Sequence, residues 1–293
     1  MPPGPPGANI TPLRTRAALD KALADHRNSG ETLALVPTMG ALHDGHLRLI
    51  ETARHHAQVV VASIYVNPLQ FGPAEDLDAY PRDEAGDLAA LASAGCGYAY
   101  LPRTGEMYPP GDQTRIHPGP LAEPLDGASR PGHFEGVCTV VAKLFGHVRP
   151  DLAVFGEKDF QQLQVIRQMT RDLALAPNIV GVPTVREADG LALSSRNRYL
   201  NAAQREAAAA LPAILAKVAA RILGGVATDT ALIQGLDALG AAGFEADYLE
   251  LRRDDDLSPL PARPLRREEA AGARLFVAAR MGRTRLIDNR PLS

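Results

Sequence analysis

The sequence of 293 residues is poor in cysteine and has no strong excess of one charge. Its two cysteines, Cys96 and Cys138, are too few for a disulfide framework and lack zinc-site spacing. Both stand in apolar surroundings, so we expect reduced core residues, which fits a reducing cytoplasm. A formal net charge of −3 gives no sign of a nucleic-acid-binding surface.

The sequence also lacks a signal peptide and an apolar run suited to spanning a membrane. Its most membrane-like segment, residues 207–225, carries Lys217 and Arg221 and is typical of an amphipathic helix. The first ten residues are rich in proline and glycine and are predicted to be disordered. Together these absences predict a cytoplasmic protein without a nucleic-acid or membrane partner.

The length allows one large domain or two ordinary ones, and 45% apolar residues are enough for a sizeable core. Short apolar runs predict strands at 32–38, 59–66, 98–102, 151–157 and 178–185. Helical patterns lie between them, near 46–57, 83–95, 134–147 and 159–173. This alternation predicts an α/β fold with a Rossmann-like, doubly wound parallel sheet that has helices on both faces.

The pattern changes near residue 200. Two Ala-rich helices are expected at about 202–225 and 228–242, followed by a strand at 245–252 and a hairpin-like end at 273–288. We therefore expect two domains, one covering residues 1–184 and a smaller C-terminal α+β domain covering residues 185–293. Clefts between domains are common ligand sites.

The segment "PTMGALHDGH", residues 37–46, joins the first predicted strand to the first predicted helix. A helix N-terminus exposes unpaired N–H groups and the positive end of the helix dipole, so it binds anions. Gly45 would let a phosphate approach the backbone, and His43 and His46 would donate hydrogen bonds to it. A metal-binding pair and an ordinary polar turn are the alternatives. No cysteine or further histidine nearby has ligand spacing, so phosphate is favoured.

A second strand-to-helix turn lies in "FGEKDFQQLQ", residues 155–164. Lys158 would project toward the carboxyl ends of the strands, where it is either a phosphate ligand or a surface charge. Asp159 would cap the helix or accept hydrogen bonds from a ribose. Gln162, one turn on, would point a neutral amide into the cleft.

Two further polar groups follow predicted strands. Ser194, Ser195 and Arg196 stand at the domain junction, as a polyphosphate clamp or as a helix N-cap. Asn67 and Gln70 follow the buried strand at 59–66, and neutral amides there suit hydroxyl and carboxylate groups. An ordinary Asn-Pro turn is the alternative for this second group.

Taken together, these segments resemble one family, the pantothenate synthetases (pantoate–β-alanine ligases) of the His-x-Gly-His nucleotidyltransferase superfamily. The resemblance runs from about residue 36 to residue 200, with a weaker continuation in "YLELR" and in "DN" near the end. Its blocks are "PTMGALHDGH", "VNPLQFGP", "DLDAYPR", "RPGHFEGVCTVVAKL", "FGEKDFQQ" and "VREADGLALSSRNRYL". A lone His-x-Gly-His is weak evidence, whereas six blocks in order are strong.

The resemblance implies an ATP-dependent condensation of pantoate with β-alanine through pantoyl adenylate, with release of AMP and pyrophosphate. It also implies Mg²⁺, a homodimer and a C-terminal domain that acts as a lid. It places His43, His46, Lys158 and Arg196 in catalysis. The implied ATP-binding residues are Met39, His43, Gly45, His46, Gly156, Lys158, Asp159, Val185, Leu193, Ser194, Ser195 and Arg196. The implied pantoate-binding residues are Met39, Asn67, Gln70 and Gln162.

Several positions depart from the family pattern, and two of them bear on charged groups. In the family, an aspartate in the helix after "YPR" is associated with Mg²⁺, and Asp87 is the matching candidate, although Gly86 stands where some relatives carry an acidic residue. The triphosphate itself would supply most metal ligands. Glu135 replaces a common arginine, which would put a negative charge near Arg130 and His133.

Three rival functions are weighed against the ligase. An adenylyltransferase for a phosphorylated acceptor would need further basic residues, whereas the amides of Gln70 and Gln162 favour a small hydroxy acid. A tRNA-charging enzyme would need a basic anticodon-binding region, which is absent. A nucleotide-binding regulator without catalysis would not need the full set of phosphate-side residues. No convincing Ser-His-Asp or Cys-His arrangement suggests a covalent mechanism.

Overall fold

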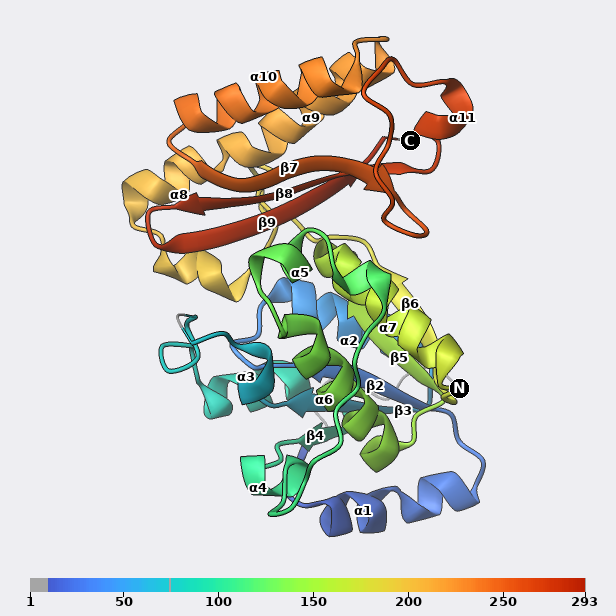
Figure 1. Cartoon of the computed structure of the whole chain (residues 1–293). Coiled ribbons are helices and arrows are strands. Elements are labelled where there is room, and N and C mark those ends of the chain that lie inside the picture. The colour runs from blue at the N-terminus through green and yellow to red at the C-terminus, as the bar shows by residue number, and fades with distance from the viewer. Residues whose placement is uncertain (1–9, 74, 293) are drawn as a thin grey trace.

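The computed structural model describes residues 10–73 and 75–292 (Figure 1). The predicted disorder of the N-terminus therefore falls outside the described residues, except for Ile10. A six-stranded parallel sheet has the order β1-β4-β3-β2-β5-β6. Its strands are β1 (Thr11–Leu13), β2 (Leu33–Thr38), β3 (Val59–Ile64), β4 (Tyr98–Tyr100), β5 (Leu152–Gly156) and β6 (Asn178–Val182).

Helices cover both faces of this sheet, as predicted for a doubly wound fold (Figure 1). Successive strand residues point to opposite faces. Leu33 and Leu35 of β2 join the core with α1 (Arg16–Asn28), α6 (His133–Val148) and α7 (Phe160–Asp172). Ala34 and Val36 join the core with α2 (Asp44–His56) and α3 (Glu84–Ser93). Burial on both faces explains why β2 and β3 are continuous apolar runs.

The strand order reverses between β2 and β5, since the chain continues from β2 to β3 on one side and from β5 to β6 on the other. Only Ala34–Leu152 and Leu35–Ala153 are paired between these two strands. The strands therefore part before their carboxyl ends. A crevice at such a reversal is the usual ligand site of doubly wound sheets.

The C-terminal part contains a three-stranded antiparallel sheet of order β7-β8-β9. In Figure 1 this sheet lies between the helices α9 and α10 and the parallel-sheet part of the molecule. Its own core joins Leu215 of α9 to Leu275 of β8. The elements are η4 (Ser195–Tyr199), α8 (Ala202–Ala208), α9 (Ala210–Leu223), α10 (Thr228–Ala241), β7 (Glu245–Arg253), α11 (Arg267–Ala270), β8 (Ala273–Met281) and β9 (Thr284–Pro291). Among the described residues, no helix has both the length and the apolar character needed to cross a membrane.

The short elements lie in the connections of the first part: η1 (Pro68–Gln70), α4 (Thr104–Met107), η2 (Pro120–Ala122), α5 (Asp126–Ser129) and η3 (Glu157–Asp159). The expected strand at 178–185 ends at Val182, because Pro183 has no N–H to continue a ladder. The single helix expected at 202–225 is two helices that meet at Ala209. Both cysteines are free and fully buried, as predicted.

Candidate active site

A cavity of about 220 Å³ opens at the reversal between β2 and β5. Because both strands end there, it collects segments that lie far apart in the sequence. It is lined by every residue that the sequence resemblance assigns to ATP or pantoate, except Asn67: Met39, His43, Gly45, His46, Gln70, Gly156, Lys158, Asp159, Gln162, Val185, Leu193, Ser194, Ser195 and Arg196.

The two histidines form the N-terminal cap of α2. The Nδ1 atom of His43 accepts a hydrogen bond from the backbone N–H of Gly45 at 3.1 Å, and the Nδ1 atom of His46 accepts one from the N–H of His43 at 3.3 Å. A ring nitrogen that accepts carries no proton. Each neutral ring therefore has its proton on Nε2, so both rings are hydrogen-bond donors at that atom.

Both rings are neutral at physiological pH. Burial lowers the pKa of His43 to about 4, and the nearby charges of Lys158 and Arg198 act in the same direction. Burial, assisted by His43 and Lys158, lowers the pKa of His46 to about 3. The two imidazoles lie with their centroids 4.1 Å apart, so charging both would place like charges side by side.

Besides the predicted close approach of a phosphate, Gly45 also permits the packing of the His43 ring. A Cβ atom at this position would lie 2.8 Å from Cε1 and 2.9 Å from Nδ1 of His43. The absence of a side chain therefore leaves room for the His43 ring over the first turn of α2.

The turn before His43 is held in an unusual conformation by Asp87. Gly40 and Ala41 both have positive φ, 80° and 51°. The Asp87 carboxylate accepts the backbone N–H of Ala41 at 2.9 Å through Oδ2 and that of Leu42 at 2.7 Å through Oδ1. A Cβ atom at Gly40 would lie 2.7 Å from Oδ2. Asp87 thus fixes the backbone that leads to His43.

This geometry does not match the metal-binding role that the resemblance implies for Asp87. Asp87 is 4% exposed and is absent from the lining of the cavity. Across residues 10–73 and 75–292, no group of three or more His, Cys, Asp or Glu side chains is arranged to hold a metal ion. The described residues therefore do not form a protein cage for Mg²⁺.

The turn that carries Lys158 is held from the C-terminal sheet. Asn289 of β9 donates through Nδ2 to the carbonyl oxygens of Glu157 and Lys158 at 2.8 and 2.9 Å, and Arg274 donates to its Oδ1 at 2.7 Å. The Lys158 ammonium lies 3.9 Å from a carboxylate oxygen of Asp159. Asn289 was not predicted as a site residue, although the weak "DN" similarity near the end marks its position.

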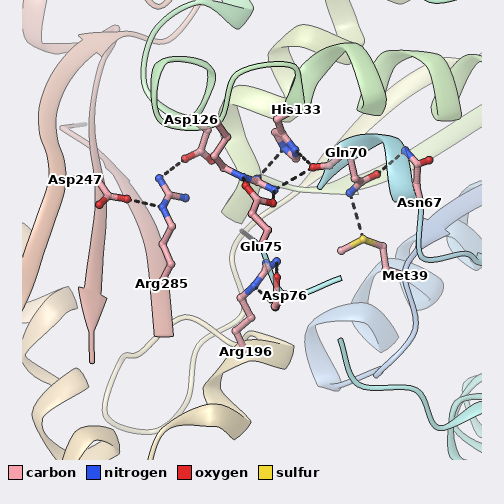
Figure 2. A network of polar contacts seen from close by, with 11 residues as sticks. Met39, Asn67, Gln70, Glu75, Asp76, Asp126, His133, Arg196, Asp247 and Arg285 are labelled. Atoms are coloured by element: carbon pink, nitrogen blue, oxygen red, sulfur yellow. Dashed lines mark hydrogen bonds and ion pairs between the residues drawn. The ribbon is translucent and has the colours of Figure 1, made fainter. Parts of the chain in front are cut away.

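The segment 194–196 contains a helix cap, but not that of the predicted 202–225 helix, whose first part, α8, is capped by Asn201. The polyphosphate clamp stays a prediction. Ser194 is the N-cap of η4, since its side chain accepts the N–H of Arg196 at 3.3 Å. The hydroxyl of Ser195 lies 3.1 Å from that of Tyr80, and Arg196 forms a bidentate ion pair with Asp76 (Figure 2). Tyr80 and Asp76 were not predicted individually, although Tyr80 lies in the quoted block "DLDAYPR" and Asp76 begins it.

Asn67 lies outside the lining of the cavity and contacts residues that border it. It is 1% exposed, and its Nδ2 donates to the carbonyl oxygen of Gly136 and to Oε1 of Gln70, both at 3.1 Å. Tyr108 donates to its Oδ1 at 2.8 Å. Asn67 therefore holds Gln70, whose Nε2 also lies 3.2 Å from the sulfur of Met39 (Figure 2). The expected contact of Asn67 with pantoate stays a prediction.

One side of the cavity is apolar, which the motifs did not predict. It is formed largely by α6, whose backbone approaches η1 because Gly136 has no side chain; a Cβ there would lie 2.3 Å from the carbonyl oxygen of Leu69. The apolar lining here consists of Tyr65, Val137, Val140, Val141, Leu144 and Phe155. The buried face of the segment "GVCTVVAKLF" was the available signal for it. The lining of the cavity thus combines cationic and hydrogen-bond-donating side chains with an apolar wall and two amides.

The negative charge beside Arg130 belongs to Glu75 and not, as expected, to Glu135. Arg130 forms a bidentate pair with Glu75 at 2.7 Å for both bonds, whereas Glu135 lies 3.1 Å from His117. Arg130 and His133 both contact the carbonyl oxygen of Gln70. Neither lines the main cavity, so their position supports the backbone of Gln70.

Comparison with known proteins identifies the relatives of this chain. The family model described as Pantoate-beta-alanine ligase matches residues 11–291. A pantothenate synthetase of Mycobacterium sp. (strain KMS) is 57% identical over 265 residues, which cover 90% of this chain and 82% of that protein. The crystal structure of pantothenate synthetase from Thermus thermophilus has a TM-score of 0.89 at 47% identity and covers 97% of this chain and 99% of that one. The Francisella tularensis pantoate-beta-alanine ligase, complexed with beta-gamma ATP and beta-alanine, has a TM-score of 0.80 at 32% identity, with 97% and 98% covered.

Proposed function

The chain belongs to the pantoate–β-alanine ligase family and condenses pantoate with β-alanine using ATP, and we propose that the cavity between β2 and β5 carries both steps of this reaction through pantoyl adenylate. The observation that carries the proposal is that one cavity is lined both by cationic and donor side chains, which we assign as its phosphate end, and by an apolar wall with two amides, which we assign as its acid end. The residues at each end fit the substrate group assigned to it.

The triphosphate of ATP lies at the end where positive charge and donors gather. Lys158 and Arg196 supply the charges, while His43 and His46 present Nε2–H donors beside the N-terminus of α2. Donors that are already oriented stabilise charge as it develops on a leaving pyrophosphate, and they do so without reorganisation. Because their Nδ1 atoms already accept backbone hydrogen bonds, the two histidines act as donors and not as bases.

The ribose and adenine lie along the wall formed by Gly156, Asp159, Val185 and Leu193. The N–H of Leu193 donates to the carbonyl oxygen of Val185 at 3.0 Å, which joins two segments of this wall. The carboxylate of Asp159, whose side chain is 48% exposed, is an acceptor suited to ribose hydroxyls.

Pantoate lies at the apolar end. Its two methyl groups match Val140, Val141 and the other apolar residues there, and its hydroxyl groups match the amides of Gln70 and Gln162. A small number of placed polar groups in an apolar lining is the usual composition of a small-molecule site. The sulfur of Met39 borders the same end and touches Gln70.

In the first step, a carboxylate oxygen of pantoate attacks the α-phosphorus of ATP, and the bond to the pyrophosphate oxygen breaks. In the second step, the neutral amine of β-alanine attacks the acyl carbon, the bond from this carbon to the AMP oxygen breaks, and the nitrogen loses a proton to solvent. Displacement at phosphorus needs alignment and charge neutralisation more than covalent help. No nucleophilic side chain is therefore required in this cavity.

Mg²⁺ is proposed as part of the nucleotide substrate. The described residues do not form a cage for it, and both oxygens of Asp87 accept backbone N–H groups. Mg²⁺ usually takes most of its ligands from phosphates and water. We therefore assign its coordination to the triphosphate.

We divide the chain into residues 1–184 and a lid domain of residues 185–293, supported by the core that α9, α10 and the antiparallel sheet share. Leu257 and Phe276 of the lid domain belong instead to a core of the first domain, so the two parts also pack together. The sequence resemblance is the ground for a homodimer, which sedimentation velocity tests. Cytoplasmic localisation is proposed from the two free, buried thiols of Cys96 and Cys138.

Oxygen labelling tests the adenylate directly. Pantoate carrying ¹⁸O in both carboxylate oxygens is converted with ATP and β-alanine, and the products are analysed by mass spectrometry. The proposal expects one ¹⁸O in AMP and none in pyrophosphate. Formation of ADP, or of AMP without label, would overturn the proposed pantoyl adenylate.

A further inference from the structure

Two carboxylates in the segment 75–80 each bind an arginine from a distant part of the chain. Glu75 pairs with Arg130, and Asp76 pairs with Arg196 (Figure 2). The first pair lies beside Gln70 at the acid end of the cavity. The second pair contains Arg196, which the proposed function places on the triphosphate, so Asp76 contacts a residue of the first reaction step.

The Asp76–Arg196 pair has the geometry of a fixed fork. Nε of Arg196 donates to Oδ2 of Asp76 at 3.0 Å, and Nη2 donates to Oδ1 at 2.8 Å. The Arg196 and Asp76 side chains are 27% and 24% exposed. A bidentate arginine–carboxylate pair fixes the plane of the guanidinium as well as its position.

Further contacts hold the same two segments together. The hydroxyl of Tyr80 lies 3.1 Å from that of Ser195, and the Tyr80 ring centroid lies 5.8 Å from Cζ of Arg196. Tyr199 donates to the carbonyl oxygen of Ala79 at 3.2 Å. The segment 75–80 is therefore attached to segment 194–199 by these contacts as well as by the ion pair.

We propose that Asp76 is a positioning residue that holds the Arg196 guanidinium toward the triphosphate during the first step, an inference that rests on the proposed function. With Nε and Nη2 bound to Asp76, Nη1 of Arg196 makes no hydrogen bond within the described residues, which leaves it available to a phosphate oxygen. An arginine without a partner would lose rotamer entropy on binding the substrate. Asp76 fixes the guanidinium before ATP arrives.

Asp76 and ATP are both negatively charged, so Asp76 cannot act by attracting the nucleotide. Burial alone would raise the pKa of Asp76, but the hydrogen bonds and the charge of Arg196 outweigh it and leave the pKa lowered. The carboxylate is thus charged when ATP binds and repels its phosphates. Removing the charge should not weaken ground-state binding of ATP, while removing the orientation should slow the reaction.

The experiment compares Asp76→Asn, Asp76→Glu, Arg196→Ala and the double variant Asp76→Asn/Arg196→Ala in pantoate-dependent exchange of labelled pyrophosphate into ATP. Asp76→Asn should lower the maximal rate about 10- to 100-fold, as expected for a misplaced group, without raising the KM for ATP. The double variant should be no slower than Arg196→Ala, because Asp76 acts only through Arg196. Asp76→Glu, which keeps the charge, should recover part of the rate.

Glu269→Gln is the matched control. Glu269 also forms a bidentate pair, with Arg263, but it lies in the C-terminal domain and does not line the cavity. It should keep the wild-type exchange rate, and unfolding midpoints of all variants identify any that fail to fold. A wild-type rate in Asp76→Asn, additive losses in the double variant, or an equal loss in Glu269→Gln would overturn the inference. Failure of the proposed function would instead appear as no pantoate-dependent exchange in the unaltered enzyme.

Discussion

Replacement of Asp87 by Asn separates a role in holding the backbone from a role in binding metal. In the structure both carboxylate oxygens accept backbone N–H groups, those of Ala41 and Leu42. An asparagine offers one oxygen and one NH₂ group, so one bond is lost and two donors face each other. Loss of a hydrogen bond to a charged acceptor, with a buried donor left unsatisfied, should cost roughly 2–4 kcal/mol of unfolding free energy.

The same change should reach the chemistry through His43, because the turn with positive φ at Gly40 and Ala41 leads directly into it. A displacement of about 1 Å at a reacting group can lower a rate about 10²-fold. Urea unfolding gives the stability, and pyrophosphate exchange over a series of Mg²⁺ concentrations gives the rate. We expect a lower rate at every concentration with an unchanged half-saturating Mg²⁺ concentration.

Asp83→Asn is the control for this variant. Asp83 is the exposed N-cap of the same helix, and asparagine caps helices as well as aspartate does. Stability and rate should therefore stay near those of the unaltered protein. If Asp87→Asn instead keeps its stability and needs a much higher Mg²⁺ concentration, Asp87 is a metal ligand and the reasoning from the two hydrogen bonds is refuted.

Three further predictions follow from the same contacts. Gly45→Ala should fold but exchange pyrophosphate about 10²-fold more slowly, since its Cβ would lie 2.8 Å from Cε1 of His43; a normal rate would show that the ring position is unimportant. In ¹⁵N NMR of labelled histidine, His43 and His46 should show protonated Nε2 and should stay neutral from pH 8 to 5.5, because burial lowers both pKa values, to about 4 and about 3. Their neutral forms are favoured by folding, so this contribution to stability is complete above pH 6.5 and is lost as the pH falls toward 4; titration near 6.5 would contradict this. Asn67→Ala should raise the KM for pantoate more than that for ATP, since Asn67 holds Gln70, and an equal rise in both would argue against it.

The buried strands were predictable because each is apolar on both faces. The segments 32–38 and 59–66 contain β2 and β3, and the sheet has the predicted parallel, doubly wound form. The edge strand β1 was missed because three residues give no periodic signal. Helix α1 was also missed, although Thr15 at its N-cap and the buried pair Leu19 and Leu23 supplied a helical pattern.

Residues at the strand ends were predictable as a set, since the carboxyl ends of parallel strands meet at one edge. Their partners were harder, because partnership depends on packing between distant segments. Asp76 pairs with Arg196 across 120 positions of sequence, and Asn289 reaches Lys158 across 131. Asn67 and Asp87 illustrate the same limit: their residue types were recognised as functional, but their contacts with Gln70 and with the backbone before His43 depend on burial between distant segments. Their ligand roles stay predictions.

The exchange of labelled pyrophosphate into ATP tests the central claim most directly, because it reports the first step alone. With pantoate present and β-alanine absent, the enzyme should catalyse exchange. His46→Ala should lower that rate about 10²–10³-fold, as for the loss of one oriented donor, while the protein stays folded. Exchange that requires β-alanine, or a wild-type rate in folded His46→Ala, would contradict adenylation of pantoate by these residues.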